Sequence, residues 1–182
     1  LKQFGIRPSE LTQTDDREIS QEQPEDEGGA VYARCDIWAA NDAFDPLVGR
    51  QEEIDRLILA FSRKIKSSAL IVGERGVGKT TLAQGIARLI AQDLMPDRLK
   101  GMKFCALNFS ALKSGCLFYG DLTKRFRDFI DSVTRDSSAI VFLDDMHKIL
   151  NGSSADEFAD LLAMMLAHPK IHVLGASTHR GL

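Results

Sequence analysis

The chain has 182 residues, of which 44% are hydrophobic and 27% are charged, and its formal net charge at pH 7 is −3. This length can form one domain with a sizeable core, and the slightly acidic balance indicates no large nucleic-acid-binding surface, although it leaves room for a local basic patch. No apolar run approaches membrane-spanning length, no signal peptide is visible, and the three cysteines are spaced too irregularly for a disulfide framework or a zinc site. We therefore expect a cytoplasmic protein that does not contact membranes.

The first 44 residues differ in composition from the rest of the chain. Residues 1–30 are polar and acidic, and residues 31–44 carry enough apolar side chains to dock onto a domain, at a place that the sequence does not indicate. We expect residues 1–44 to be an acidic linker or tail that is partly ordered, and residues 45–182 to form the folded domain. Because the chain begins with Leu1 and ends at Leu182 just after a predicted strand, we also expect it to be part of a longer protein.

Short apolar runs alternate with helical patterns from residue 51 onwards. Buried strands are predicted at residues 69–72, 103–107, 139–143 and 171–174. Helices are predicted where apolar residues recur at helical spacing, at residues 54–65, 82–93, 122–133 and 158–166, whereas residues 112–120 are predicted to form a loop. This alternation predicts an α/β fold, with a parallel sheet of about four strands covered by helices on both faces.

The sequence GERGVGKTT joins the first predicted strand to the next helix at residues 73–81. It fits the phosphate-loop pattern G-x-x-x-x-G-K-[ST] in the context that the pattern requires, so a glycine turn without a ligand explains it less well. Lys79 can reach the β- and γ-phosphates of a nucleotide, and Thr80 can offer its hydroxyl to Mg²⁺. Glycines let backbone amides approach the phosphates at a helix N-terminus. The predicted nucleotide-binding residues of this loop are Gly73, Gly76, Val77, Gly78, Lys79, Thr80 and Thr81.

Polar residues follow two other predicted strands at the same edge of the sheet. Asp144 and Asp145 come directly after residues 139–143, and Thr178 follows the last strand. Because the carboxyl ends of parallel strands meet at one edge, we expect these residues beside the phosphate loop. Asp144 would hold Mg²⁺ together with Thr80, and Asp145 would orient or deprotonate the attacking water. The alternative for this acidic pair is an N-cap of the turn that follows it.

At this point residues from about 45 to 178 resemble the first ATPase module of the Clp-type AAA+ unfoldases and disaggregases. The segments that carry the resemblance are DPLVGR at 45–50, SGCLFYGD at 114–121, DDMH at 144–147 and GAST at 175–178. The resemblance implies a P-loop NTPase fold of the AAA+ large-subdomain type, with ATP and Mg²⁺ bound at a subunit interface of a homo-hexameric ring. It also implies that Leu47 and Val48 lie near the adenine and that Thr178 contacts the γ-phosphate region. Phe118, with Tyr119 beside it, would belong to the pore loop that grips a substrate polypeptide.

The chain departs from the family pattern in several places. Leu117 and Tyr119 stand where lysine and arginine are usual, which makes the loop less cationic, and Phe118 and Tyr119 could instead pack against a neighbouring element. Asp145 replaces a glutamate and is one C–C bond shorter, roughly 1.5 Å. Because a misplacement near 1 Å can cost about 10²-fold in rate, hydrolysis would be slow unless the backbone compensates. The family's fifth strand, arginine finger and lid subdomain are absent from this sequence.

The resemblance implies an ATPase module of a ring-forming chaperone that unfolds or remodels protein substrates by threading them through a pore, with a peptidase or adaptor as a further partner. Two alternatives stay open: an ATP-dependent assembly switch or scaffold that hydrolyses weakly because of Asp145, and a loader or initiator acting on nucleic acid. The aromatic loop and the lack of basic excess argue against nucleic acid. Lys124, Arg125 and Arg127 are expected to form a solvated face of the third helix, with contact to an adjacent subunit as the alternative.

Overall fold

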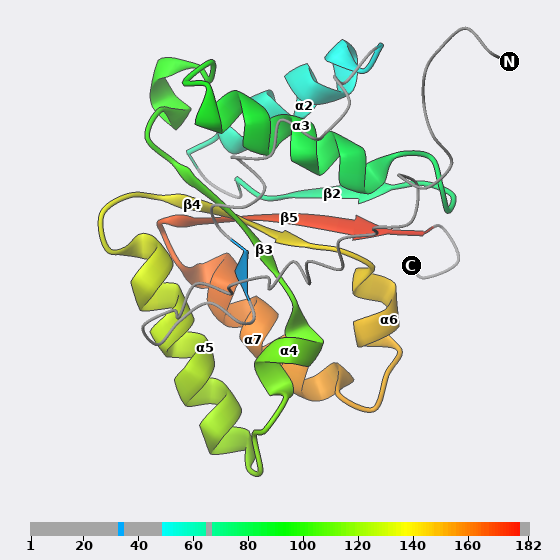
Figure 1. Cartoon of the computed structure of the whole chain (residues 1–182), viewed down its shortest axis with the longest axis vertical. Helices are drawn as coiled ribbons and strands as arrows, with labels where there is room; N and C mark the ends of the chain where they lie inside the picture. Colours follow the sequence, from blue (N-terminus) through cyan, green and yellow to red (C-terminus); the bar gives the residue numbers. More distant parts are fainter. Residues whose placement is uncertain (1–32, 35–48, 65–66, 179–182) are drawn as a thin grey trace, which may run out of the picture.

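The computed structural model describes residues 33–34, 49–64 and 67–178, and a sheet with strand order β1-β3-β4-β5-β2 runs through its centre. Its strands are β1 (Ala33–Arg34), β2 (Ala69–Val72), β3 (Lys103–Leu107), β4 (Ala139–Leu143) and β5 (Ile171–Ser177). The four strands from β2 to β5 are parallel to their neighbours, which confirms the predicted sheet, while the two-residue β1 pairs with β3 in the antiparallel direction. All four parallel strands therefore end at one edge of the sheet (Figure 1).

Helices cover both faces of this sheet, as predicted (Figure 1). One face carries α2 (Gln51–Phe61), α3 (Lys79–Ala91) and the short helix η2 (Asp97–Leu99). The other face carries α4 (Phe109–Lys113), α5 (Tyr119–Thr134), α6 (Met146–Leu150) and α7 (Ala155–Ala167). Across the described residues, no helix combines the length and the apolar character that a membrane span requires.

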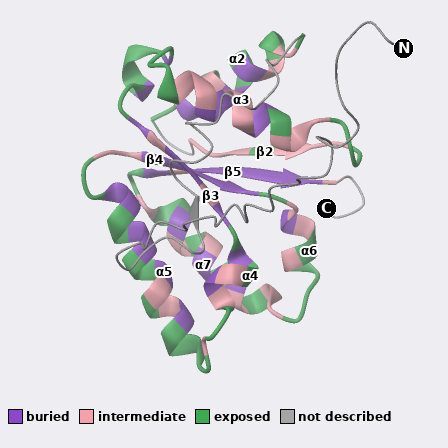
Figure 2. Cartoon of the chain, viewed as in Figure 1, coloured by how far each residue is buried: buried purple, intermediate pink, exposed green. Residues whose placement is uncertain are grey.

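The central strand β4 explains why two separate cores form. All five of its residues are buried. Ile140 and Phe142 pack into the core beneath α2 and α3, whereas Val141 and Leu143 pack into the core beneath α5 and α7. Successive side chains of a strand point to opposite faces, so a continuous apolar run is what a strand buried on both sides requires. Figure 2 shows the buried residues concentrated along the sheet and on the helix faces turned towards it.

Several boundaries differ from the sequence prediction. The strand predicted at 171–174 continues to Ser177 because Val72 of β2 pairs with it there. Residues 109–113 form α4, which overlaps the start of the loop predicted at residues 112–120, since Asn108 caps this helix by accepting a hydrogen bond from the Ala111 amide at 3.1 Å. The helix predicted to reach residue 65 ends at Phe61, and residue 65 lies outside the described residues.

The cysteines also differ from the expectation. Cys105 is buried in β3 and is disulfide-bonded, whereas Cys116 is a free thiol. Irregular spacing argued against a disulfide framework and gave no sign of this single bond. Spacing along the chain says nothing about which segments lie side by side, and this is why the bond could not be predicted.

Candidate nucleotide-binding site

The loop between β2 and α3 has the backbone geometry that its glycines predict. Gly76 and Gly78 have φ angles of 83° and 85°, in the left-handed region that glycine adopts without strain. Gly78 is the N-cap of α3, so the loop delivers its amides to the N-terminal end of a 13-residue helix. Such an end attracts anions through its unpaired N–H groups and the helix dipole.

Lys79 places its positive charge directly over this loop. Its Nζ atom donates hydrogen bonds to the carbonyl oxygens of Gly73 and Glu74, both at 3.0 Å. The ammonium group and the amides at the start of α3 thus lie around the same turn of backbone. This arrangement can neutralise several negative charges of a phosphate chain.

The acidic residue Asp144 meets the phosphate loop across the sheet. Thr80 Oγ1 donates a hydrogen bond to Asp144 Oδ2 at 2.7 Å, and the other carboxylate oxygen accepts from the Asp145 amide at 2.8 Å. The contact joins residues that are 64 positions apart in the sequence. It is the juxtaposition expected from two parallel strands that end at the same edge.

Thr80 and Asp144 form a donor set that fits Mg²⁺. Within the ranges that the structure describes, no group of three or more His, Cys, Asp or Glu residues could hold a metal ion alone. A magnesium ion in a nucleotide site needs no such cage, because it typically takes one or two protein oxygens and completes its shell with phosphates and water. One hydroxyl and one carboxylate already in contact satisfy this requirement.

Asp145 lies next to this pair but is held towards α6. It is the N-cap residue of α6, with φ 49° and ψ 40°, yet its side chain makes no capping hydrogen bond, so a purely capping role is not supported. Its carboxylate forms an ion pair with Lys148, one turn further along α6. The hydrogen bond from Lys148 lowers the pKa of Asp145, and the charges of Lys148, His147 and Lys79 lower it further, against the opposing effect of burial. The group is therefore an ionised acceptor, better suited to orienting water than to taking a proton from it.

The start of α6 is fixed against the sheet at Gly175 of β5. A Cβ atom built at this position would overlap Met146 Sδ and would lie 2.8 Å from Leu70 Cδ1. Only glycine lets Met146, the first residue of α6, approach the strand this closely. Since Asp145 immediately precedes Met146, this contact helps to set the position of the Asp145 backbone.

Arg50 is a site residue that sequence analysis missed. Its guanidinium donates to the carbonyl oxygen of Val77 in the phosphate loop at 2.6 Å and to Glu53 Oε1 at 2.9 Å. Arg50 therefore ties the first turn of α2 to the loop. The sequence does not reveal where a side chain points. The one signal that could have identified Arg50 was its place in the segment 45–50, which carries the family resemblance.

The remaining predicted residues are placed less directly. Gly73 donates its amide to the Ser177 carbonyl at 3.3 Å, so Thr178, the residue after β5, lies at the same edge as the phosphate loop. Thr81 is exposed in the first turn of α3. Leu47 and Val48, predicted near the adenine, lie outside the described residues.

A second candidate feature is the loop at residues 114–118, between α4 and α5. Leu117 and Phe118 are 85% and 74% exposed. Tyr119 behaves differently, because it is the first residue of α5 and its hydroxyl donates to Asp160 Oδ2 of α7 at 3.0 Å. This hydrogen bond raises the pKa of Tyr119. The structure thus separates the predicted pair into an exposed Phe118 and an anchored Tyr119.

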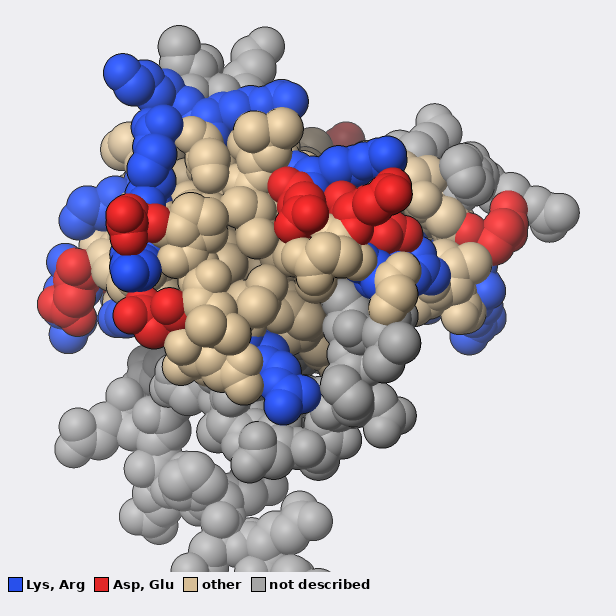
Figure 3. Space-filling model, turned by 90° about the horizontal axis from the view of Figure 1, so that it is seen from above, with Lys and Arg blue, Asp and Glu red and all other residues tan. Residues whose placement is uncertain are grey.

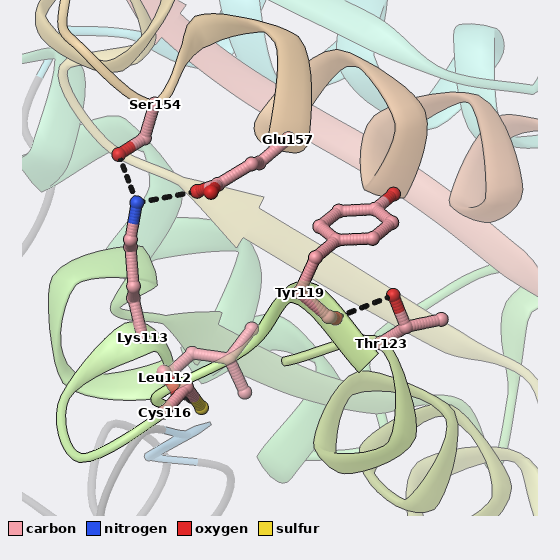
Figure 4. Close-up of polar contacts among 7 residues, drawn as sticks. All are labelled: Leu112, Lys113, Cys116, Tyr119, Thr123, Ser154 and Glu157. Carbon is pink, nitrogen blue, oxygen red and sulfur yellow. Dashed lines mark hydrogen bonds and ion pairs between the residues drawn. The ribbon is translucent and has the colours of Figure 1, made fainter. Parts of the chain in front are cut away.

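The base of this loop is held firmly, although its tip is exposed. Arg125 of α5 donates to the carbonyl oxygens of Leu112 at 3.0 Å and Ser114 at 2.6 Å, so the prediction that it belongs to a solvated face is wrong. Lys113 bonds to Ser154 at 2.5 Å and forms an ion pair with Glu157, both at the start of α7 (Figure 4). The anchored base presents Leu117 and Phe118 on a defined support.

The comparisons with known proteins agree with this geometry. The sequence of residues 69–181 matches the family described as ATPase family associated with various cellular activities (AAA). Heat shock protein 104 of Schizosaccharomyces pombe is 37% identical over 77% of this chain and 16% of its own length. Chaperone protein ClpB of Rhodopseudomonas palustris is 37% identical over 81% of this chain and 17% of its own length. The chain thus spans about a sixth of these relatives. A structure of Hsp104 with ATPγS and casein superposes with a TM-score of 0.70 at 33% identity, covering 82% of this chain and 27% of that one.

Proposed function

Because the chain belongs to the AAA family of ATPases, we propose that it is the ATP-binding and ATP-hydrolysing large subdomain of a ring-forming, Clp-type protein-unfolding chaperone. The single observation that carries this proposal is the hydrogen bond from Thr80 to Asp144 at 2.7 Å, beside an ammonium group that lies over the phosphate loop. A loop, a cation and a metal-binding pair converge on the place where a triphosphate would lie. A turn that merely joined a strand to a helix would not need all three.

Each residue has a distinct task in this proposal. The amides at the start of α3 and the Lys79 ammonium hold the β- and γ-phosphates, and Thr80 and Asp144 hold Mg²⁺. When bound, Mg²⁺ neutralises phosphate charge and orients the phosphate chain. Asp145 orients the attacking water, and Thr178 contacts the γ-phosphate region. Arg50 positions the loop through Val77.

The chaperone part of the proposal rests on the loop at residues 114–118. An exposed apolar pair on an anchored base suits transient contact with an unfolded polypeptide, because such a chain offers apolar side chains in no fixed order. The Hsp104 structure that superposes on this chain contains casein. We propose that Phe118 makes the corresponding contact here, that Tyr119 supports it, and that the complete protein works as a homo-hexamer.

Four further features belong to the same proposal. These are a cytoplasmic location without membrane contact, a domain boundary near residue 45, a lid subdomain outside this sequence and a peptidase or adaptor partner. Their support is the sequence pattern described above. Salt-sensitive DNA binding by the full-length protein would instead favour the loader or initiator, and turnover near zero with intact ATP binding would favour the assembly switch.

The decisive experiment measures ATP affinity of the full-length protein with and without Mg²⁺. Lys79→Ala should abolish binding in both conditions, because the charge over the loop is lost. Asp144→Asn should weaken only the Mg²⁺-dependent component. Lys124→Ala, on the exposed side of α5, is the matched control and should bind as the unaltered protein does. Unchanged affinity in Lys79→Ala would refute the site.

A further inference from the structure

A second pocket lies at the opposite end of the strands from the phosphate loop. It has a volume of about 460 Å³ and is bounded by the end of α2, by η2 and by residues that precede β2, β3, β4 and β5. This volume is within the range of small-molecule sites, roughly 300–1,000 Å³. Since β5 is seven residues long, the two ends of the sheet are separated by about 20 Å at a rise of about 3.3 Å per residue.

The described lining of the pocket carries more positive than negative charge. Its charged lining residues are Arg63, Lys64, Arg98 and Lys100, and no Asp or Glu among the described residues lines it. Lys100 pairs with Asp97 at 3.1 Å on the outer side, whereas the side chains of Arg63, Lys64 and Arg98 form no ion pair or hydrogen bond with any described residue. This concentration is local, because the whole chain has a net charge of −3. Figure 3 shows Lys and Arg side chains along the side of the molecule where β2 and β5 begin, with Asp and Glu side chains among them.

Hydroxyl groups and a neutral histidine complete the wall. Ser67, Ser137 and Ser138 line the pocket, and the buried Ser137 Oγ has no hydrogen-bond partner among the described residues. A buried hydroxyl without a partner is unusual in a folded protein, so this oxygen retains an unused donor at the wall of the pocket. His172 contacts the Ser67 carbonyl through Nδ1 at 3.1 Å. Burial lowers the pKa of His172, so this side chain lines the pocket without adding a positive charge.

We propose that this pocket binds an oligophosphate anion at a site separate from the nucleotide site. Unpaired guanidinium groups favour phosphate oxygens because they donate in a planar fork, and serine hydroxyls donate to the same oxygens. Several adjacent phosphates match several cations spread around one opening better than a single carboxylate does. The site does not depend on the proposed ATPase function, since none of its residues belongs to the phosphate loop.

The test measures binding of tripolyphosphate by calorimetry in the full-length protein carrying Lys79→Ala, which removes binding at the phosphate loop. We expect binding in this background that weakens as salt rises. Arg63→Gln combined with Arg98→Gln should weaken it at least tenfold, whereas Lys124→Gln combined with Arg127→Gln, on the exposed side of α5, should leave it unchanged. The oligophosphate could be free or could belong to a nucleotide, and ATP in the same background distinguishes the two. ATP competes with tripolyphosphate only if the pocket also accepts a nucleotide's phosphate chain.

A second measurement needs no pocket variant and therefore does not depend on how such a variant folds. Tripolyphosphate should protect Lys64 and Lys100 from chemical acetylation, read by mass spectrometry, while Lys124 stays reactive. Two results overturn the proposal: no binding once Lys79 is replaced, or binding that neither the arginine variants nor the acetylation pattern assigns to this pocket. In either case the phosphate loop or general surface charge accounts for the anion.

Discussion

Asp145→Glu should accelerate ATP hydrolysis, although it replaces a residue that the proposed mechanism uses. The carboxylate of Asp145 is held at the start of α6 and is paired with Lys148. Glutamate extends the side chain by one C–C bond, roughly 1.5 Å, which would let the carboxylate reach further from the start of α6. Because a misplacement near 1 Å costs about 10²-fold, we expect kcat to rise by about 10- to 100-fold, or about 1.4–2.7 kcal/mol.

The ion pair contributes a smaller, separable amount. The side chains of Lys148 and Asp145 are 61% and 43% exposed, and pairs this exposed contribute about 0–1 kcal/mol. Lys148→Ala should therefore raise kcat by no more than about fivefold. The gain from Asp145→Glu also has a cost in stability, since Asp145 has a left-handed backbone that aspartate adopts more readily than glutamate. We expect the free energy of unfolding to fall by about 1 kcal/mol.

The assay is steady-state hydrolysis by the full-length protein, with kcat and KM determined separately for the unaltered protein, the two single variants and the double variant. ATP affinity should stay constant, because neither residue holds the phosphates. If Asp145→Glu turns over no faster than the unaltered protein, the distance argument fails. If Lys148→Ala gives the larger gain, the ion pair rather than side-chain length limits the reaction.

Three further predictions concern other parts of the domain. Phe118→Ala should impair unfolding of a tagged substrate while leaving ATP hydrolysis intact, and Tyr119→Phe, which loses only the hydrogen bond to α7, should impair it less; equal unfolding by all forms would remove the pore assignment. Gly175→Ala should lower the free energy of unfolding by about 1–3 kcal/mol in urea titrations, because the new methyl group displaces Met146; a neutral result would mean that α6 moves freely. Because burial lowers the pKa of His172 in the folded state, the unfolded chain takes up a proton on this residue at a higher pH, from about 6.5 downwards, than the folded protein does. Stability should therefore fall on acidification from pH 7.5 to 5.5, and His172→Gln should reduce that fall in thermal melts; an unchanged fall would assign it to other groups.

The sheet could be predicted because each strand is a short apolar run, although only the central β4 is buried along its whole length and Leu70 of the edge strand β2 is exposed. The run from Ala139 to Leu143 needs apolar residues on both faces, so its pattern is unmistakable. By contrast, the last three residues of β5 are glycine, alanine and serine, whose intrinsic strand preference is weak, and only pairing with β2 extends the strand to Ser177. Helix α4 was missed because a single buried pair, Phe109 and Leu112, is too short a pattern to indicate a helix.

In the site too, contacts set by the course of the backbone could be predicted, whereas contacts set by the direction of a side chain could not. The contact of Thr80 with Asp144 follows from strand order, since both residues come directly after or near the carboxyl ends of parallel strands. The ion pair of Asp145 with Lys148 depends on α6, where the sequence indicated only a turn, so their spacing of one helical turn was not visible. The hydrogen bond of Tyr119 to Asp160 joins two helices whose relative placement no local pattern specifies.

Arg50 connects α2 to the phosphate loop. Its guanidinium is a rigid plane that holds the Val77 carbonyl on one side and the first turn of α2 on the other. The Val77 carbonyl and the Gly78 amide belong to the same planar peptide group, so neither can tilt without the other. A ligand that reorients this peptide group would therefore act on the hydrogen bond through which Arg50 links the loop to the first turn of α2.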